Sequence, residues 1–70
     1  MAKTDRALRE VRQRTVAWDP DLGCEGGFRW ADGRRIDNYP LLMELWAAKL
    51  NGLVHVDGGV VLPSTPGGGS

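Results

Sequence analysis

The sequence predicts a small α+β domain in which a helix, a β-hairpin, a second helix and a second β-hairpin follow one another. A charged segment with helical periodicity opens the chain, a proline-capped apolar segment lies further along, and short apolar runs flank glycine-containing turns. The length of 70 residues permits one domain only. We expect this domain to span residues 1–63, and residues 64–70, rich in Gly, Ser and Pro, to form a flexible tail.

The first helix is expected to begin after Thr4, a good N-cap residue, and to run to about Trp18. With about 100° between successive residues, one stripe of the helix collects Ala7, Leu8, Val11, Thr15 and Trp18. Asp19-Pro20 then ends the helix, because a residue before proline is disfavoured in the helical region. This is the pattern of an amphipathic helix that packs its apolar stripe on a core.

The loop from Asp19 to Glu25 is acidic, which raises the question of a calcium site. Counted from Asp19, the fifth, sixth and twelfth positions of an EF-hand loop would be Gly23, Cys24 and Trp30, and none is the residue that the site needs. Cys24 is the only cysteine, so an intrachain disulfide and a multi-cysteine zinc site are excluded. We therefore expect no metal and no cofactor.

The first hairpin is expected to run from Phe28 to Ile36 around a turn at Asp32-Gly33. A three-residue loop sets Phe28 opposite Ile36, whereas a two-residue loop would set it opposite a charged residue, so the hydrophobic pattern favours the longer loop.

In that register Arg29 and Arg35 lie side by side on the outer face, where they repel unless something negative is near. The negative group could be a phosphate, an acidic partner, or the chain's own Asp19 and Asp21.

The second helix has clear end signals: Asn38 caps it, Pro40 is tolerated in its first turn, and Gly52 stops it. Its large apolar residues spread over more than half of the circumference, and they are Leu41, Leu42, Met43, Leu45, Trp46 and Leu50. A helix that packs on a core needs an apolar stripe only about 100° wide. The surplus indicates either central burial of the helix or a second contact surface. Because a chain this short has little material for central burial, we favour a second contact surface, with Lys49 at its edge.

The last hairpin is expected to pair Leu53–Val56 with Val60–Leu62 around a three-residue Asp57-Gly58-Gly59 loop. With this loop or with another loop length, both faces of this hairpin are substantially apolar, so one face again lacks a partner. His55 is the only histidine, and no nucleophile stands at a recognisable motif spacing from it, so we interpret it as a strand residue.

No catalytic constellation is present, so we expect a protein that is not an enzyme. The leading hypothesis is an interaction module, such as an accessory subunit, that self-associates as a homo-oligomer or docks on a larger protein assembly. The predicted partner-binding residues are Leu42, Met43, Trp46, Lys49, Leu50, His55 and Val61. No apolar run approaches the roughly 20 residues of a membrane span, and we expect a cytoplasmic location.

A second hypothesis is DNA binding. The helix followed by Gly-Leu-Val-His-Val-Asp-Gly-Gly-Val-Val-Leu-Pro resembles the end of a winged-helix DNA-binding domain, where a recognition helix leads into a two-stranded wing. The resemblance covers residues 40–63. It implies phosphate contacts from basic side chains of the first helix and the first hairpin, namely Arg6, Arg9, Arg29, Arg34 and Arg35.

Overall fold

A computed structural model describes residues 4–64, and it confirms the predicted class and order of elements. The elements are α1 (Asp5–Arg12), β1 (Val16–Asp19), β2 (Gly27–Trp30), α2 (Tyr39–Leu50), β3 (Val54–Asp57) and β4 (Val60–Pro63). The flexible tail predicted for residues 64–70 lies outside the described residues, except for Ser64, whose backbone N–H donates a hydrogen bond to the carbonyl of Leu53.

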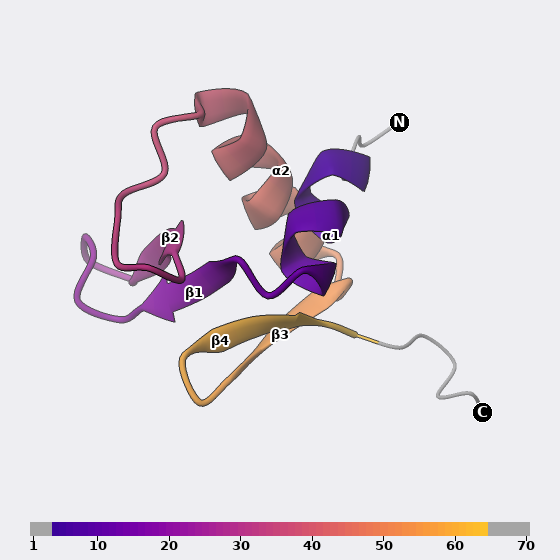
Figure 1. Ribbon diagram of the computed structural model, residues 1–70. Helices are drawn as coiled ribbons and strands as arrows, with labels where there is room; N and C mark the ends of the chain where they lie inside the picture. Colours follow the sequence, from indigo (N-terminus) through magenta and orange to yellow (C-terminus); the bar gives the residue numbers. More distant parts are fainter. Residues whose placement is uncertain (1–3, 65–70) are drawn as a thin grey trace.

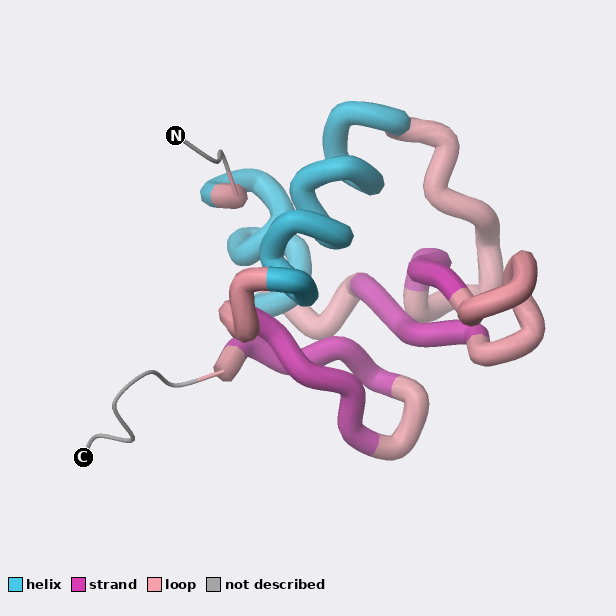
Figure 2. The backbone as a smooth tube through the Cα atoms, turned by 180° about the vertical axis from the view of Figure 1, so that it is seen from behind, coloured by secondary structure: helices cyan, strands magenta, loops and turns pink. Residues whose placement is uncertain are grey.

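The strands form one antiparallel sheet in the order β2-β1-β4-β3, with both helices on one side of it (Figures 1 and 2). The two hairpins are joined where Ala17 of β1 lies opposite Val60 of β4 and the Trp18 N–H donates to the Gly59 carbonyl over 2.8 Å. The described residues therefore form two layers, and none of their helices or strands covers the sheet face turned away from α1 and α2, which we call the open face.

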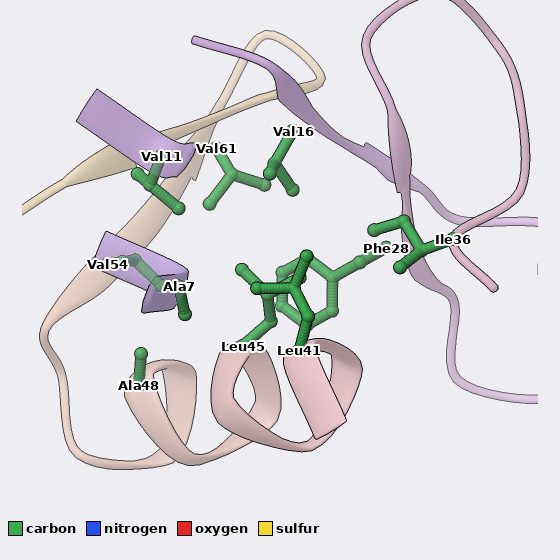
Figure 3. Close-up of a cluster of buried hydrophobic side chains, with 10 residues drawn as sticks. All are labelled: Ala7, Val11, Val16, Phe28, Ile36, Leu41, Leu45, Ala48, Val54 and Val61. Carbon is green, nitrogen blue, oxygen red and sulfur yellow. The ribbon is translucent and has the colours of Figure 1, made fainter. Parts of the chain in front are cut away.

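The core fills the space between the two layers (Figure 3). It is made of Ala7, Val11, Val16, Phe28, Ile36, Leu41, Leu45, Ala48, Val54 and Val61. The helices contribute residues three, four or seven positions apart, as the helical period requires, and each strand contributes one residue from the face that is turned toward the helices.

The first helix is shorter than the sequence indicates. It ends at Arg12, and Arg14 adopts a left-handed backbone with φ of 60°. The Arg14 N–H donates to the Val11 carbonyl over 3.0 Å, and the Thr15 N–H donates to the Glu10 carbonyl over 3.2 Å, which together form a Schellman end. The prediction of a helix to Trp18 was wrong because the β-branched and aromatic residues that follow form a strand.

That strand, β1, pairs with β2, which the sequence pattern predicted to be the first strand of the hairpin from Phe28 to Ile36. Val16 lies opposite Trp30 and Trp18 lies opposite Phe28. The predicted pairing of Arg29 with Arg35 is present as an isolated bridge, and Gly33 has the left-handed φ of 96° that the three-residue loop requires. The predicted register of residues 28–36 was therefore correct. This pairing involves only one edge of β2, however, because the other edge of β2 pairs with β1.

The ends of α2 agree with the sequence signals. The Asn38 side chain accepts a hydrogen bond from the Leu41 N–H over 3.3 Å, and Gly52 follows the helix with φ of 73°. The Leu53 N–H then donates to the Ala48 carbonyl, which leads the chain directly from α2 into β3.

The last hairpin has a two-residue turn at Gly58-Gly59, with φ of 60° and 86°, instead of the predicted three-residue loop. Two successive residues with positive φ match the right-handed twist of the flanking strands. The one-residue change in register sets Val56 opposite Val61 and turns Val61 into the core.

Candidate functional site

The outward side of α2 carries a row of large apolar side chains, which we call the α2 stripe. Its members are four, three and four residues apart, so they lie along one side of the helix, and they are Tyr39, Met43, Trp46 and Leu50. Tyr39 is 67% exposed, Met43 56% and Leu50 81%. The core side of the same helix is formed by Leu41, Leu45 and Ala48, all buried. The helix is therefore apolar on two opposite sides, and one of them faces solvent.

The structure sorts the predicted partner-binding residues into different places. Met43, Leu50 and His55 are exposed, while Leu42 is half-buried beside Phe28 and Ile36. Tyr39 was missed by sequence reasoning, although its spacing from Met43 contained the signal.

Val61, also predicted to bind a partner, is fully buried in the core because the two-residue turn rotates it inward. It is therefore not available for contact with another molecule.

His55 is exposed on the open face of the sheet, away from the α2 stripe in the two-layer arrangement. Its Nδ1 lies 3.1 Å from the Ser64 Oγ, a serine and histidine pair that sequence spacing did not indicate. Among the described residues both groups are accessible to solvent, and the contact between them is exposed, whereas active sites exclude water. We therefore read it as a surface hydrogen bond.

Trp46 is the partly buried member of the α2 stripe, because its ring packs against two other aromatic rings. Trp18, Phe28 and Trp46 pack edge to face, with ring centroids 5.1 to 5.7 Å apart. Such pairs contribute about 0.5–1.5 kcal/mol each beyond their burial. Trp46 thus belongs to both the core and the surface.

Lys49 lies beside these rings. Its ammonium is 5.3 Å from the Trp18 ring centroid and 5.8 Å from that of Trp46. Contacts of this kind attract a cation to the ring face. The positive charge is therefore held by the chain's own aromatic residues at the border of the α2 stripe.

The surface next to Trp46 and Leu50 continues into a shallow hollow lined also by Cys24, Glu25 and Gly26. Gly26 has φ of 88°, and a Cβ at this position would lie 2.6 Å from Cζ2 of Trp18. This close approach holds the loop between β1 and β2 against the aromatic residues. It also places the Cys24 thiol, which is exposed, beside the end of the α2 stripe.

The five predicted nucleic-acid contacts do not all remain free. Arg29 forms an ion pair with Asp19, with Nη2 2.6 Å from Oδ2, and its Nη1 donates to the Gly33 carbonyl. Arg34 lies 3.9 Å from Asp32. Asp19 therefore neutralises Arg29, whereas Arg34 and Asp32 form only a long contact between two exposed side chains.

The other three arginines are exposed on different elements. Arg6 and Arg9 lie on α1, in the helical layer, whereas Arg35 lies beside Arg29 at the edge of β2. The predicted phosphate contacts thus belong to two separate parts of the surface.

Within residues 4–64, no group of three or more His, Cys, Asp or Glu side chains is placed to hold a metal ion. Neither helix in this part of the chain has the length and apolar character needed to span a membrane. No protein-family model, curated protein or solved structure matches the chain. Functional inference therefore begins from the α2 stripe.

Proposed function

We propose that this protein is a small, non-enzymatic interaction module whose α2 stripe binds another protein surface. The observation that carries the proposal is the exposure of Tyr39, Met43 and Leu50 on successive turns of a helix whose opposite side is already buried. Large apolar patches are rare on soluble monomers and usually mark an interaction site. Protein association through this surface is the function that the geometry supports best.

The energetics favour burial of this surface by a partner. Removing apolar surface from water contributes about 25 cal/mol per Å², and aromatic side chains bring about 150–250 Å² each. Trp46 is already fixed by Trp18 and Phe28, so binding would not have to order this side chain. We expect Trp46 and Leu50 to contribute most of the binding energy.

Charge substitution on the α2 stripe tests the proposal. Leu50→Glu and Met43→Glu place carboxylates on exposed positions, so they should leave the fold intact and abolish association. The measurement is molar mass by size-exclusion chromatography with light scattering over a wide concentration series, with circular dichroism as the check on folding. Trp46→Asp is less informative, because this ring packs against the core.

Val60→Lys is the control, since Val60 is 38% exposed, alternates with the buried Val61 and lies on β4 rather than on α2. If Val60→Lys weakens association as strongly as Leu50→Glu, the α2 stripe is not the contact surface. A protein partner from a larger assembly must be tested after purification, by formation of a stoichiometric complex with the wild-type chain and not with Leu50→Glu. The proposal includes a cytoplasmic location, which cell fractionation would check.

DNA binding would be recognised by a different pattern. Arg6→Glu with Arg9→Glu would then weaken binding to duplex DNA and flatten its salt dependence, while Leu50→Glu would leave it unchanged. That result, together with no association through the α2 stripe, would overturn the proposed function.

A further inference from the structure

The α2 stripe has a spacing that is symmetric about its own centre. Tyr39 and Leu50 are equally far in sequence from the midpoint between Glu44 and Leu45, and so are Met43 and Trp46. When two such helices pack antiparallel across a twofold axis at this midpoint, Tyr39 lies opposite Leu50 of the other copy and Met43 lies opposite Trp46. A twofold interface has this reciprocity, because each surface patch contacts its own copy.

The charges beside the α2 stripe do not oppose this packing. The Oε1 of Glu44 accepts a hydrogen bond from the Ala7 N–H over 3.3 Å, so this carboxylate is turned toward α1. The Lys49 ammonium lies over Trp18 and Trp46. Ala47 also lies along the border, and its small side chain allows two helices to approach closely. Glu25, which lines the hollow next to Trp46 and Leu50, is exposed and lies on the loop between β1 and β2 rather than on α2. An apolar contact between the two helices can therefore form without burying an unpaired charge.

We propose that the partner of the α2 stripe is a second copy of this chain, bound as an antiparallel α2 pair with its twofold axis between Glu44 and Leu45. This inference rests on the proposed function and specifies the partner. The exposed parts of the four side chains on two copies amount to an area on the order of 1,000 Å², near the lower limit for a specific interface. The dimer should therefore be weak and depend on concentration.

Cross-linking between two different cysteine variants tests the arrangement. Tyr39→Cys and Leu50→Cys are each made in a Cys24→Ser background, mixed in equal amounts at high concentration, and oxidised mildly. In the antiparallel pair, the two different positions meet within the Cα separation that a disulfide allows, about 4.4–6.8 Å. Identical positions are separated by eleven residues along the helices, about 16 Å, which is too far.

Mass spectrometry of the cross-linked species reads out the result. We expect the mixed species to dominate over both homodimeric species by at least about tenfold, and expect it to disappear when both chains also carry Met43→Glu. Predominance of the two homodimeric species would overturn the antiparallel arrangement. If the molar mass of the wild-type chain nevertheless doubled at high concentration and Leu50→Glu prevented this doubling, the proposed function would stand without the antiparallel arrangement.

Two further outcomes separate the claims. A chain that stays monomeric at the highest concentration, with no cross-linked product, contradicts a second copy as the partner, and the proposed function then depends on the purified-partner experiment. A dimer that forms equally well with Leu50→Glu contradicts both the proposed function and the antiparallel α2 pair, because association would then use another surface.

Discussion

Arg14 occupies a backbone conformation that glycine usually provides. Its φ of 60° lies in the left-handed region at the end of α1, and it is the one non-glycine residue with positive φ between residues 4 and 64. A side chain costs roughly 1–2 kcal/mol in this region, because Cβ crowds the following carbonyl. The hydrogen bonds from Arg14 and Thr15 back to α1 hold the residue there in spite of that cost.

Arg14→Gly should stabilise the protein by about 0.5–1 kcal/mol, because relief of the strain exceeds the added entropy of the unfolded chain. Urea unfolding followed by circular dichroism measures the change. Arg12→Gly is the control, and it should destabilise by a similar amount because Arg12 lies in the last turn of α1 itself. A loss of stability in Arg14→Gly would contradict the strain assigned to this position.

Gly26 is constrained by close packing as well as by its φ of 88°. Gly26→Ala would bring a methyl group into contact with the Trp18 ring, so the ring or the loop must move. We expect a loss of about 2 kcal/mol or more in the free energy of unfolding. Gly23→Ala is a matched control, because Gly23 has a similar φ of 69° and nothing within 4 Å of the added Cβ. Equal effects of the two substitutions would show that contact with Trp18 is unimportant.

At the scale of elements, α2 combines two functions in one helix. Leu45 is fully buried between the helices and the sheet, whereas Leu50, of the same residue type, is 81% exposed. The two leucines therefore separate the contribution of α2 to folding from its contribution to association.

Leu45→Ala should reduce the free energy of unfolding by about 2–5 kcal/mol, because it leaves a cavity in the core. Leu50→Ala should change the stability of the monomer by less than about 0.5 kcal/mol but should weaken association. Denaturation at low protein concentration measures the first effect, and light scattering at high concentration measures the second. A large loss of monomer stability in Leu50→Ala would place Leu50 in the core instead.

At the scale of the whole molecule, a domain of this size buries a modest share of its surface and has marginal stability. The sheet adds little at its centre, where the two hairpins are joined by the pairing of Ala17 with Val60. The helical layer therefore holds the hairpins together through the shared core. Burial of the α2 stripe in a complex would add to this small total.

The melting temperature of the wild-type chain should rise with protein concentration, because a partner that binds only the folded state stabilises it by mass action. The Leu50→Glu variant should melt at the same temperature at all concentrations. Differential scanning calorimetry across a concentration series measures both. A concentration-independent wild-type melting temperature over the range in which light scattering shows dimers would contradict coupling between folding and association.

Much of the fold follows from local sequence signals. Asn38, Pro40 and Gly52 set the bounds of α2, and the turn at Gly58-Gly59 sets the position of the last hairpin. The apolar surplus of α2 was also evident from its helical periodicity alone. These features depend on backbone preferences and on spacing, which a chain carries before it folds.

Tertiary structure decided the features that depend on packing between distant segments. Residues 16–19 follow a helical pattern in sequence but form β1, because pairing with β2 and packing of Trp18 on Phe28 outweigh local preference. Arg29 could have contacted a phosphate, yet Asp19 lies close enough to neutralise it.

The sequence by itself determined the order of the elements and the presence of one apolar surface too many. Only the tertiary structure decided that Val61 belongs to the core and that Tyr39, Met43 and Leu50 face solvent. The physical reason is that the hydrophobic effect is non-directional: burial of an apolar side chain is favourable against any apolar surface. The position of the side chain in the sequence therefore does not specify where it is buried. The strand register and the packing of the helices on the sheet specify where each side chain is buried.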